Sequence, residues 1–185
     1  MNHWGNYNYG GWAGCDLRYD ILGSTNVAPS GYGSAASSGR KGNDATSTCA
    51  TSPVANTLMA ALPSELRAVM KPMEIYTDNT AGGSDTASYV TKSVDYLPLL
   101  AEFEIFGSRS YANSAEKNYQ AQYDYYKANN SKVKYRHNST STTAGWWERS
   151  PYYNNSNNFC NVNTNGNANN NNARNSNGLA PDFAT

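Results

Sequence analysis

The sequence has few charged residues, and their signs cancel. Asp, Glu, Lys and Arg make up 15% of the 185 residues, and the formal net charge is +0. A domain that binds nucleic acid normally carries a basic excess, so we expect no nucleic-acid partner. The sequence also lacks a run of about 18 apolar residues, the length that a membrane-spanning helix needs. We therefore expect no membrane insertion.

Cysteine is equally scarce. The three cysteines are Cys15, Cys49 and Cys160, and no C-x-x-C pair or histidine cluster accompanies them. This spacing predicts no metal site and no cofactor. Two thiol states stay open at this point. One is a disulfide plus a free thiol in an oxidising compartment, and the other is three buried reduced thiols.

Motifs for catalysis are missing as well. His3 and His137 are isolated, without a nucleophile or second base nearby in the sequence. This pattern predicts a protein that is not an enzyme. Asp78 and Asp85, with asparagines beside them, leave a calcium site open as an alternative, although their spacing differs from that of an EF-hand.

Aromatic residues are abundant, with 15 Tyr and 4 Trp, and they predict that residues 1–185 fold as one domain with a hydrophobic core. Met1 leads directly into polar and aromatic residues without a signal-peptide pattern, so we expect a C-terminal piece of a longer protein. Apolar spacing, caps and alternation predict the elements. We expect helices over 16–22, 53–62, 63–70 and 113–127, and strands over 73–77, 87–94, 101–106, 132–137 and 145–150.

Two of these elements have specific predicted roles. The helix over 113–127 is the clearest, because Asn113 caps it and Glu116 stands three residues later as the capping-box partner. In the last strand, adjacent Trp146 and Trp147 predict one core ring and one half-buried ring. Arg149 in the same strand is expected to pair with an acid.

The region after Tyr152 is dominated by asparagine. Between Asn154 and Asn177, 14 of 24 positions are Asn. Asparagine is a poor residue for a core or for long regular structure. Because Phe159, Cys160 and Val162 interrupt the asparagines, we predict a strand here rather than a disordered or aggregation-prone tail.

The rest of the tail follows from the same pattern. Asn165-Gly166 predicts a tight turn, and Ala168 continues into a return strand. Residues 169–172 have no apolar anchor and are expected to form a loop. We predict Phe159, Val162, Ala168 and Phe183 inside and the asparagines outside, with Cys160 and Val162 facing the core and Asn161 and Asn163 facing solvent.

Three segments resemble the C-terminal region of variable proteins made by diversity-generating retroelements: GWWERSP, NNFCNVNTNGNANNNN and SNGLAPDF. Three upstream segments resemble the same group: LPSELRAVMK, VDYLPLLAEFEIFGSRSYAN and YYKANNSKVKYRH. The resemblance implies a C-type-lectin-like α+β domain with helices on small antiparallel sheets and a variable region at about 146–183. One departure is Glu148, where the group would have Leu. We expect Glu148 to face water or a partner chain.

The resemblance also implies a role for the asparagines. In such systems a reverse transcriptase misincorporates at template adenines, so Asn codons can become codons for many other residues. The remaining residues stay fixed: Phe159, Cys160, Val162, Gly166, Ala168, Ala173, Gly178, Leu179, Ala180, Pro181 and Phe183. The implied ligand-binding residues are Tyr152, Tyr153, Asn154, Asn155, Asn157, Asn158, Asn161, Asn163, Asn165, Asn167, Asn169, Asn170, Asn171, Asn172, Arg174, Asn175 and Asn177.

We therefore expect a ligand-binding or adhesion domain that acts outside the cell, on a bacterial surface or on a phage virion. Its partner would be a protein or glycan on a target cell. Two alternatives stay open: a carbohydrate-binding domain of fixed specificity, and a structural tip protein that forms homo-oligomers. Fold kinship with formylglycine-generating enzymes is weak support for an activity, because those enzymes use a cysteine pair that this sequence lacks.

Overall fold

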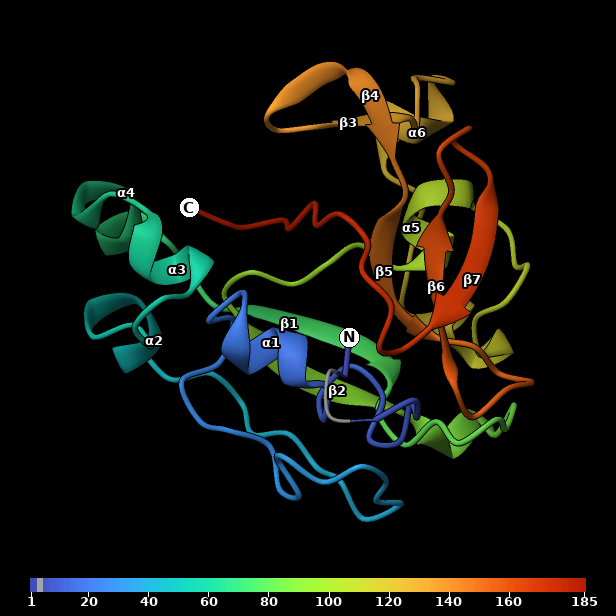
Figure 1. Cartoon of the computed structure of the whole chain (residues 1–185), viewed down its shortest axis with the longest axis horizontal. Coiled ribbons are helices and arrows are strands. Elements are labelled where there is room, and N and C mark those ends of the chain that lie inside the picture. Colours follow the sequence, from blue (N-terminus) through green and yellow to red (C-terminus); the bar gives the residue numbers. More distant parts are fainter. Residues whose placement is uncertain (3–4) are drawn as a thin grey trace.

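The computed structural model describes residues 1–2 and 5–185, and it is a mixed domain of short helices and antiparallel sheets. Figure 1 shows the α3–α4 region and the three-stranded sheet at opposite ends of the molecule. The helices are α1 (Asp16–Asp20), α2 (Thr48–Thr51), α3 (Leu58–Ala61), α4 (Ser64–Val69), α5 (Glu102–Phe106) and α6 (Asp124–Lys127), with 3-10 helices η1 (Ala87–Tyr89) and η2 (Ser114–Asn118).

The strands form three separate antiparallel sheets. The first pairs β1 (Met73–Asp78) with β2 (Val90–Asp95), and the second pairs β3 (Lys134–Arg136) with β4 (Ser139–Ala144). The third has the order β5 (Trp146–Pro151), β6 (Asn158–Val162) and β7 (Ala168–Asn172). Among the described residues, no helix has the length and apolar character needed to cross a membrane.

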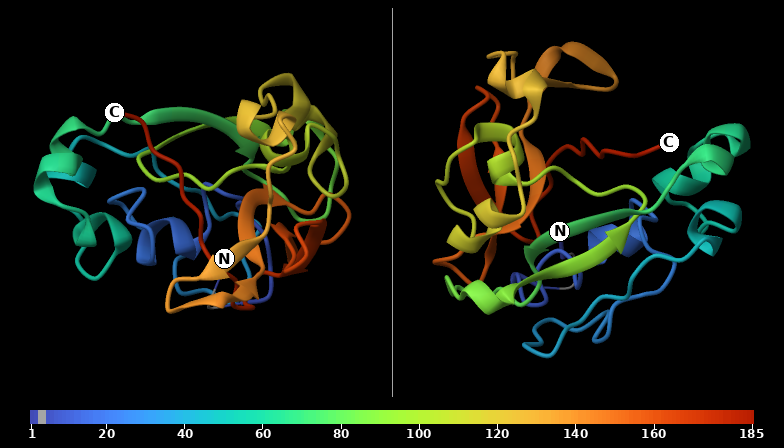
Figure 2. Two further views of the ribbon diagram at one scale, coloured as in Figure 1. Left: turned by 90° about the horizontal axis from the view of Figure 1, so that it is seen from above. Right: turned by 180° about the vertical axis from the view of Figure 1, so that it is seen from behind.

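Both faces of the β5-β6-β7 sheet are covered, and this places β6 in the core. On one face Trp147 and Phe159 pack with Trp12 and other residues of the N-terminal segment. On the other face, Trp146 and Val162 pack with Ile105 and its neighbours. The views in Figure 2 show the sheet between the N-terminal segment and the α5 region. Both tryptophans are 1% exposed, so the expected half-buried ring was wrong.

The predicted strand over 101–106 is the helix α5 instead. Alternation of Glu102 and Glu104 with apolar residues suggested one solvent face, but both carboxylates are buried. Glu104 accepts a hydrogen bond from the backbone N–H of Ala101 and closes the first turn of the helix. Gly107, at φ 68°, ends the helix in the left-handed region. Tertiary partners for the glutamates therefore overrode the strand pattern.

The long helix predicted over 113–127 is also wrong. Asn113 does cap the segment, since its side chain accepts from the N–H of Ala115. The Glu116 carboxylate, however, accepts from the N–H of Asp78, from Ser150 and from Gln120 rather than closing a capping box. The segment splits into η2 and α6 around these contacts.

Smaller differences follow the same rule. The helix expected over 53–62 shortens to α3, and strand β4 was not predicted. Residues 169–172, expected as a loop, form most of β7, because their backbone pairs with β6 throughout. The other predictions correspond to elements of the structure. The helices expected over 16–22 and 63–70 are α1 and α4, and the strands expected over 73–77, 132–137 and 145–150 are β1, β3 and β5.

Candidate ligand-binding surface

The asparagine-rich region forms the β6–β7 hairpin and the segment after it. Its fixed residues Phe159, Cys160, Val162 and Ala173 are fully buried. Among the predicted binding residues, Asn154, Asn155, Asn165, Asn167, Arg174 and Asn175 are exposed. Partly buried ones are Tyr152, Tyr153, Asn157, Asn158, Asn163, Asn169, Asn170, Asn171, Asn172 and Asn177.

Three exposure predictions for this region were wrong. Asn161 is 3% exposed, in the middle strand of the sheet, where it pairs with Trp147 on one side and Asn169 on the other. Phe183 is 45% exposed, on the C-terminal segment that runs back across the domain toward α3 and α4 (Figure 1). Ala168, expected inside, is only partly buried at the start of β7.

Several asparagine side chains hold their own backbone. Asn163 Oδ1 accepts from the N–H groups of Asn165 and Asn167, at 2.9 and 3.1 Å, and so fixes the turn. Gly166 follows with φ 84°, as the Asn-Gly pair predicted. Asn158 Nδ2 donates to Asn170 Oδ1 across β6 and β7 at 2.6 Å. These contacts separate structural asparagines from those that only face solvent.

The segment 176–179 lies along the free edge of β5. Trp147 N–H donates to the carbonyl of Gly178, and Gly178 N–H donates to Gly145. Asn177 Nδ2 is buried and has no hydrogen-bond partner among the described residues. A buried amide donor without a partner is unusual in a folded protein.

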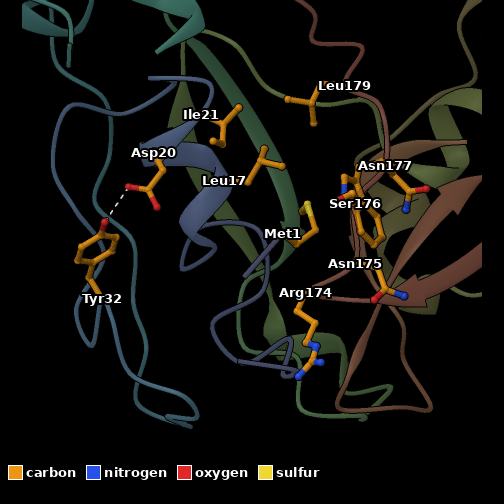
Figure 3. Close-up of a pocket in the computed structure, with 11 residues that line it drawn as sticks. Met1, Leu17, Asp20, Ile21, Tyr32, Arg174, Asn175, Ser176, Asn177 and Leu179 are labelled. Atoms are coloured by element: carbon orange, nitrogen blue, oxygen red, sulfur yellow. Dashed lines mark hydrogen bonds between the residues drawn. The ribbon is translucent and has the colours of Figure 1, made fainter. Parts of the chain in front are cut away.

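One side of this segment borders an open pocket of about 560 Å³. Leu17 of α1 and Ile21, which directly follows α1, face Leu179 across it (Figure 3). Trp147 also lines the cavity. Tyr32 donates to Asp20 at 2.9 Å on the α1 side. Arg174, Asn175, Ser176 and Asn177 supply the polar lining from the asparagine-rich segment. The apolar wall with a few convergent polar groups is typical of a ligand site.

The other side of the segment borders a second open pocket of about 800 Å³. Residues 135–138 of the β3–β4 hairpin line it opposite Ser176 and Asn177. Tyr135 is 56% exposed there. Ser176, Asn177 and Leu179 line both pockets, so one short segment presents side chains to both.

The sequence reasoning missed the residues from outside the tail: Leu17, Ile21, Tyr32, Tyr135, Arg136, His137 and Asn138. Alternation in KVKYRH indicated a strand with aromatic and basic side chains. The spacing gave no sign that this strand would lie close to residue 177 in the folded protein. His137 lines the second pocket. His3 lies outside the described residues.

Tyr152 and Tyr153 lie at the opposite end of β5 from Gly145 and line neither pocket. Their rings form a chain of edge contacts, with centroids 5.2 Å apart for Tyr111 and Tyr152 and 5.6 Å apart for Tyr152 and Tyr153. The Arg109 guanidinium lies 3.8 Å from the Tyr153 centroid. The predicted surface therefore has two separate parts, one at each end of the sheet.

A buried ion pair anchors the strand beneath this surface. Arg149 donates to both oxygens of Glu104 at 2.6 Å, to Thr77 Oγ1 at 2.8 Å and to the Leu99 carbonyl at 2.7 Å. This confirms the expected pairing of Arg149 with an acid. The interaction joins β5 to α5 and to β1, so the sheet is held independently of the asparagines.

Other predicted ligand groups are used by the protein itself. Asp78 accepts from Asn113 and from the N–H groups of Thr80 and Ala81. Asp85 pairs with Arg109 at 2.9 Å and accepts from the N–H of Ser114. Those contacts weaken the calcium alternative, because they occupy the carboxylate oxygens it requires. All three cysteines are buried and unpaired, so the disulfide alternative was wrong.

Comparison with known families adds one finding. A family described as a domain of unknown function, DUF6273, matches residues 2–184. The chain belongs to this family. The match spans nearly all of the sequence, so the core, the asparagine-rich hairpin and both pockets fall within it. No curated protein matches the chain, and no solved structure matches it either.

Proposed function

We propose that this chain is a non-enzymatic ligand-binding domain of C-type-lectin-like fold, whose asparagine positions are diversified by a retroelement. One observation carries the proposal. The buried residues Phe159, Cys160, Val162 and Ala173 alternate along the chain with asparagines that are mostly exposed or partly buried. A surface that is free to change must be separate from the residues that hold the fold.

The pockets identify where a ligand binds under this proposal. Ser176 and Asn177 lie between two open cavities, one lined in part by α1 and the other by the β3–β4 hairpin. Variation at 174–177 would thus change the polar lining while apolar residues such as Leu17 and Leu179 stay constant. Tyrosine-rich, asparagine-rich surfaces suit adaptable recognition of this kind, as antibody paratopes do.

The domain would act as an adhesion or receptor-binding module, displayed on a bacterial surface or at a phage tail tip, and recognise a protein or glycan on a target cell. Asparagine provides hydrogen bonds but little apolar burial. The present sequence, with its many asparagines, is therefore expected to bind more weakly than diversified relatives.

Two experiments test this proposal. The first is sequencing of the surrounding locus for a reverse transcriptase gene and a near-identical repeat that differs only at adenines. The second is display of a library randomised at Asn154, Asn165, Asn167, Asn175 and Asn177, panned against bacterial cells and glycan arrays. Recovery of folded binders with different specificities supports the proposal. A locus without either element refutes diversification, and a library in which every binder keeps one glycan specificity favours the fixed carbohydrate-binding alternative.

A further inference from the structure

A cluster of three buried ligand-type side chains lies beneath the sheet, away from both pockets. Glu102 of α5, Glu148 of β5 and Cys160 of β6 come from distant parts of the sequence, yet their ligand atoms lie within 4.8 Å of one another. Each of the three residues is 0% exposed. Their positions form no recognisable sequence motif, which is why the sequence predicted no metal site.

Glu148 is the unusual member of the cluster. Both of its carboxylate oxygens are buried, and neither has a hydrogen-bond partner among the described residues. This overturns the expectation that Glu148 faces water or a partner chain. Burying a carboxylate without a partner is strongly unfavourable, so the group either keeps its proton or binds a cation. Burial raises the pKa of Glu148 well above its usual range, and it is the largest cause. The nearby carboxylates of Glu102, Glu116 and Glu104 raise it further.

Glu102 is held differently. Its Oε2 atom accepts from the backbone N–H groups of Ser110, Tyr111 and Ala112, at 3.0, 2.9 and 2.8 Å, while Oε1 accepts only from Tyr111, at 2.9 Å. These bonds fix the orientation of the Glu102 carboxyl group. A carboxylate oriented by the backbone, with one oxygen carrying spare acceptor capacity, has the outer-shell support that metal ligands normally have.

We propose that Glu102, Glu148 and Cys160 bind a zinc ion. Each residue would supply one donor atom: one carboxylate oxygen of Glu148, Oε1 of Glu102 and the thiolate sulfur of Cys160. These make three protein donors, and a water molecule would take the fourth position. Zinc takes oxygen and sulfur donors in tetrahedral geometry, and its bond lengths require donor separations of about 3.5 Å. The three ligand atoms lie within 4.8 Å of one another and would move closer together on binding. Zinc would link α5, β5 and β6 on the face of the sheet opposite Trp147.

Because the site is fully enclosed, the ion would enter during folding. The test therefore unfolds the full chain in denaturant with chelator and refolds it with either zinc chloride or EDTA. We expect one zinc per chain by elemental mass spectrometry after desalting, and a higher melting temperature for the zinc-refolded protein. Refolding with cobalt is expected to give a thiolate-to-cobalt charge-transfer band, which reports sulfur coordination directly.

Matched variants separate metal binding from packing. Glu148→Leu removes one donor and fills the space with an apolar side chain. It should fold, lose zinc and melt at the same temperature in zinc and EDTA. Cys160→Ser should lose the cobalt band. Cys15→Ala, which removes a buried thiol from a different cluster, should keep full zinc content. A wild-type chain that refolds equally well in both buffers and holds no stoichiometric metal overturns the proposal, leaving Glu148 as a protonated acid.

Discussion

The division of the asparagines into structural and solvent-facing groups can be tested by paired substitutions in one turn. Asn165 and Asn167 are exposed, and so is Asn154 in the preceding loop. No side-chain hydrogen bond of these three occurs among the described residues. Asn163, in the same turn, accepts from two backbone N–H groups. The perturbations are the triple variant Asn154→Ser/Asn165→Ser/Asn167→Ser and the single variant Asn163→Ala.

The expected magnitudes differ in a useful way. Surface substitutions away from specific contacts change the free energy of unfolding by within about 0.5 kcal/mol each, so the triple variant should lose at most ~1.5 kcal/mol. Asn163→Ala leaves two N–H groups without their acceptor, as the loss of a helix cap does, and should cost about 1–2 kcal/mol on its own. Asn163→Asp keeps the acceptor oxygen and serves as the control.

Urea unfolding followed by tryptophan fluorescence measures these values, because Trp12, Trp146 and Trp147 are all buried and will report global unfolding. The reasoning is refuted if the triple variant loses more than Asn163→Ala, or if Asn163→Ala and Asn163→Asp have the same stability. Either result would mean that exposure and side-chain bonding do not separate the two groups of asparagine.

Three further substitutions test the scaffold. Arg149→Met leaves Glu104 buried without its cation and should lower the free energy of unfolding by about 3–5 kcal/mol. Adding Glu104→Gln should recover part of that loss. Urea unfolding of the two single variants and the double variant measures the recovery. Gly166→Ala places a side chain at φ 84° and should lower the free energy of unfolding by about 1–2 kcal/mol. Asparagine tolerates this backbone region, so Gly166→Asn should lower it less. Thermal melting of the two variants measures the difference. Burial raises the pKa of Glu116 from its ordinary value of 4.5 to about 7. The folded state therefore holds a proton that the unfolded state has lost between these two pH values. As pH rises from 4.5 through 7, the free energy of unfolding should fall by on the order of 3 kcal/mol because of this group. Glu116→Gln should flatten that part of the stability profile, and an unchanged pH slope would contradict the assignment.

The sequence allowed prediction of the strands that carry the surface. GWWERS, the alternation at 158–162 and the Asn-Gly turn are local signals, and β5, β6 and the turn follow them. Errors came where a polar side chain has a tertiary partner. Glu104 pairs with Arg149 and Glu116 bonds to Ser150, and neither partner is visible from local spacing. The strand over 101–106 and the capping-box role of Glu116 were therefore predicted wrongly, and both glutamates are buried in tertiary contacts.

The candidate site was predictable only in part. The tail residues were identified because asparagine is so unusual there, yet the walls of both pockets come from α1 and the β3–β4 hairpin. These meet residues 174–179 through the fold, and no sequence signal joined them. A return strand was expected to begin at Ala168, but its continuation over residues 169–172 was missed for a related reason. Its side chains have no apolar pattern, and its backbone is held by β6 alone.

Asn161 is the position where diversification and folding conflict. It lies in β6 opposite Trp147 and Asn169, it is 3% exposed, and its Oδ1 atom has no partner among the described residues. A Cβ on Gly145 would lie 3.5 Å from Asn161 Nδ2, so there is little room beside it.

Adenine-directed change of an Asn codon can give Asp, and Asp at this 3% exposed position would bury a carboxylate. We expect Asn161→Asp to lose several kcal/mol, on the order expected for an uncompensated buried charge, and Asn161→Val to be neutral or stabilising because it removes an unpaired amide. Asn165→Asp, on the exposed turn, should be near neutral. Urea unfolding of the three variants decides the matter. Equal stability of Asn161→Asp and Asn165→Asp would place residue 161 on the variable surface, whereas the expected difference places it in the scaffold and limits which diversified copies can fold.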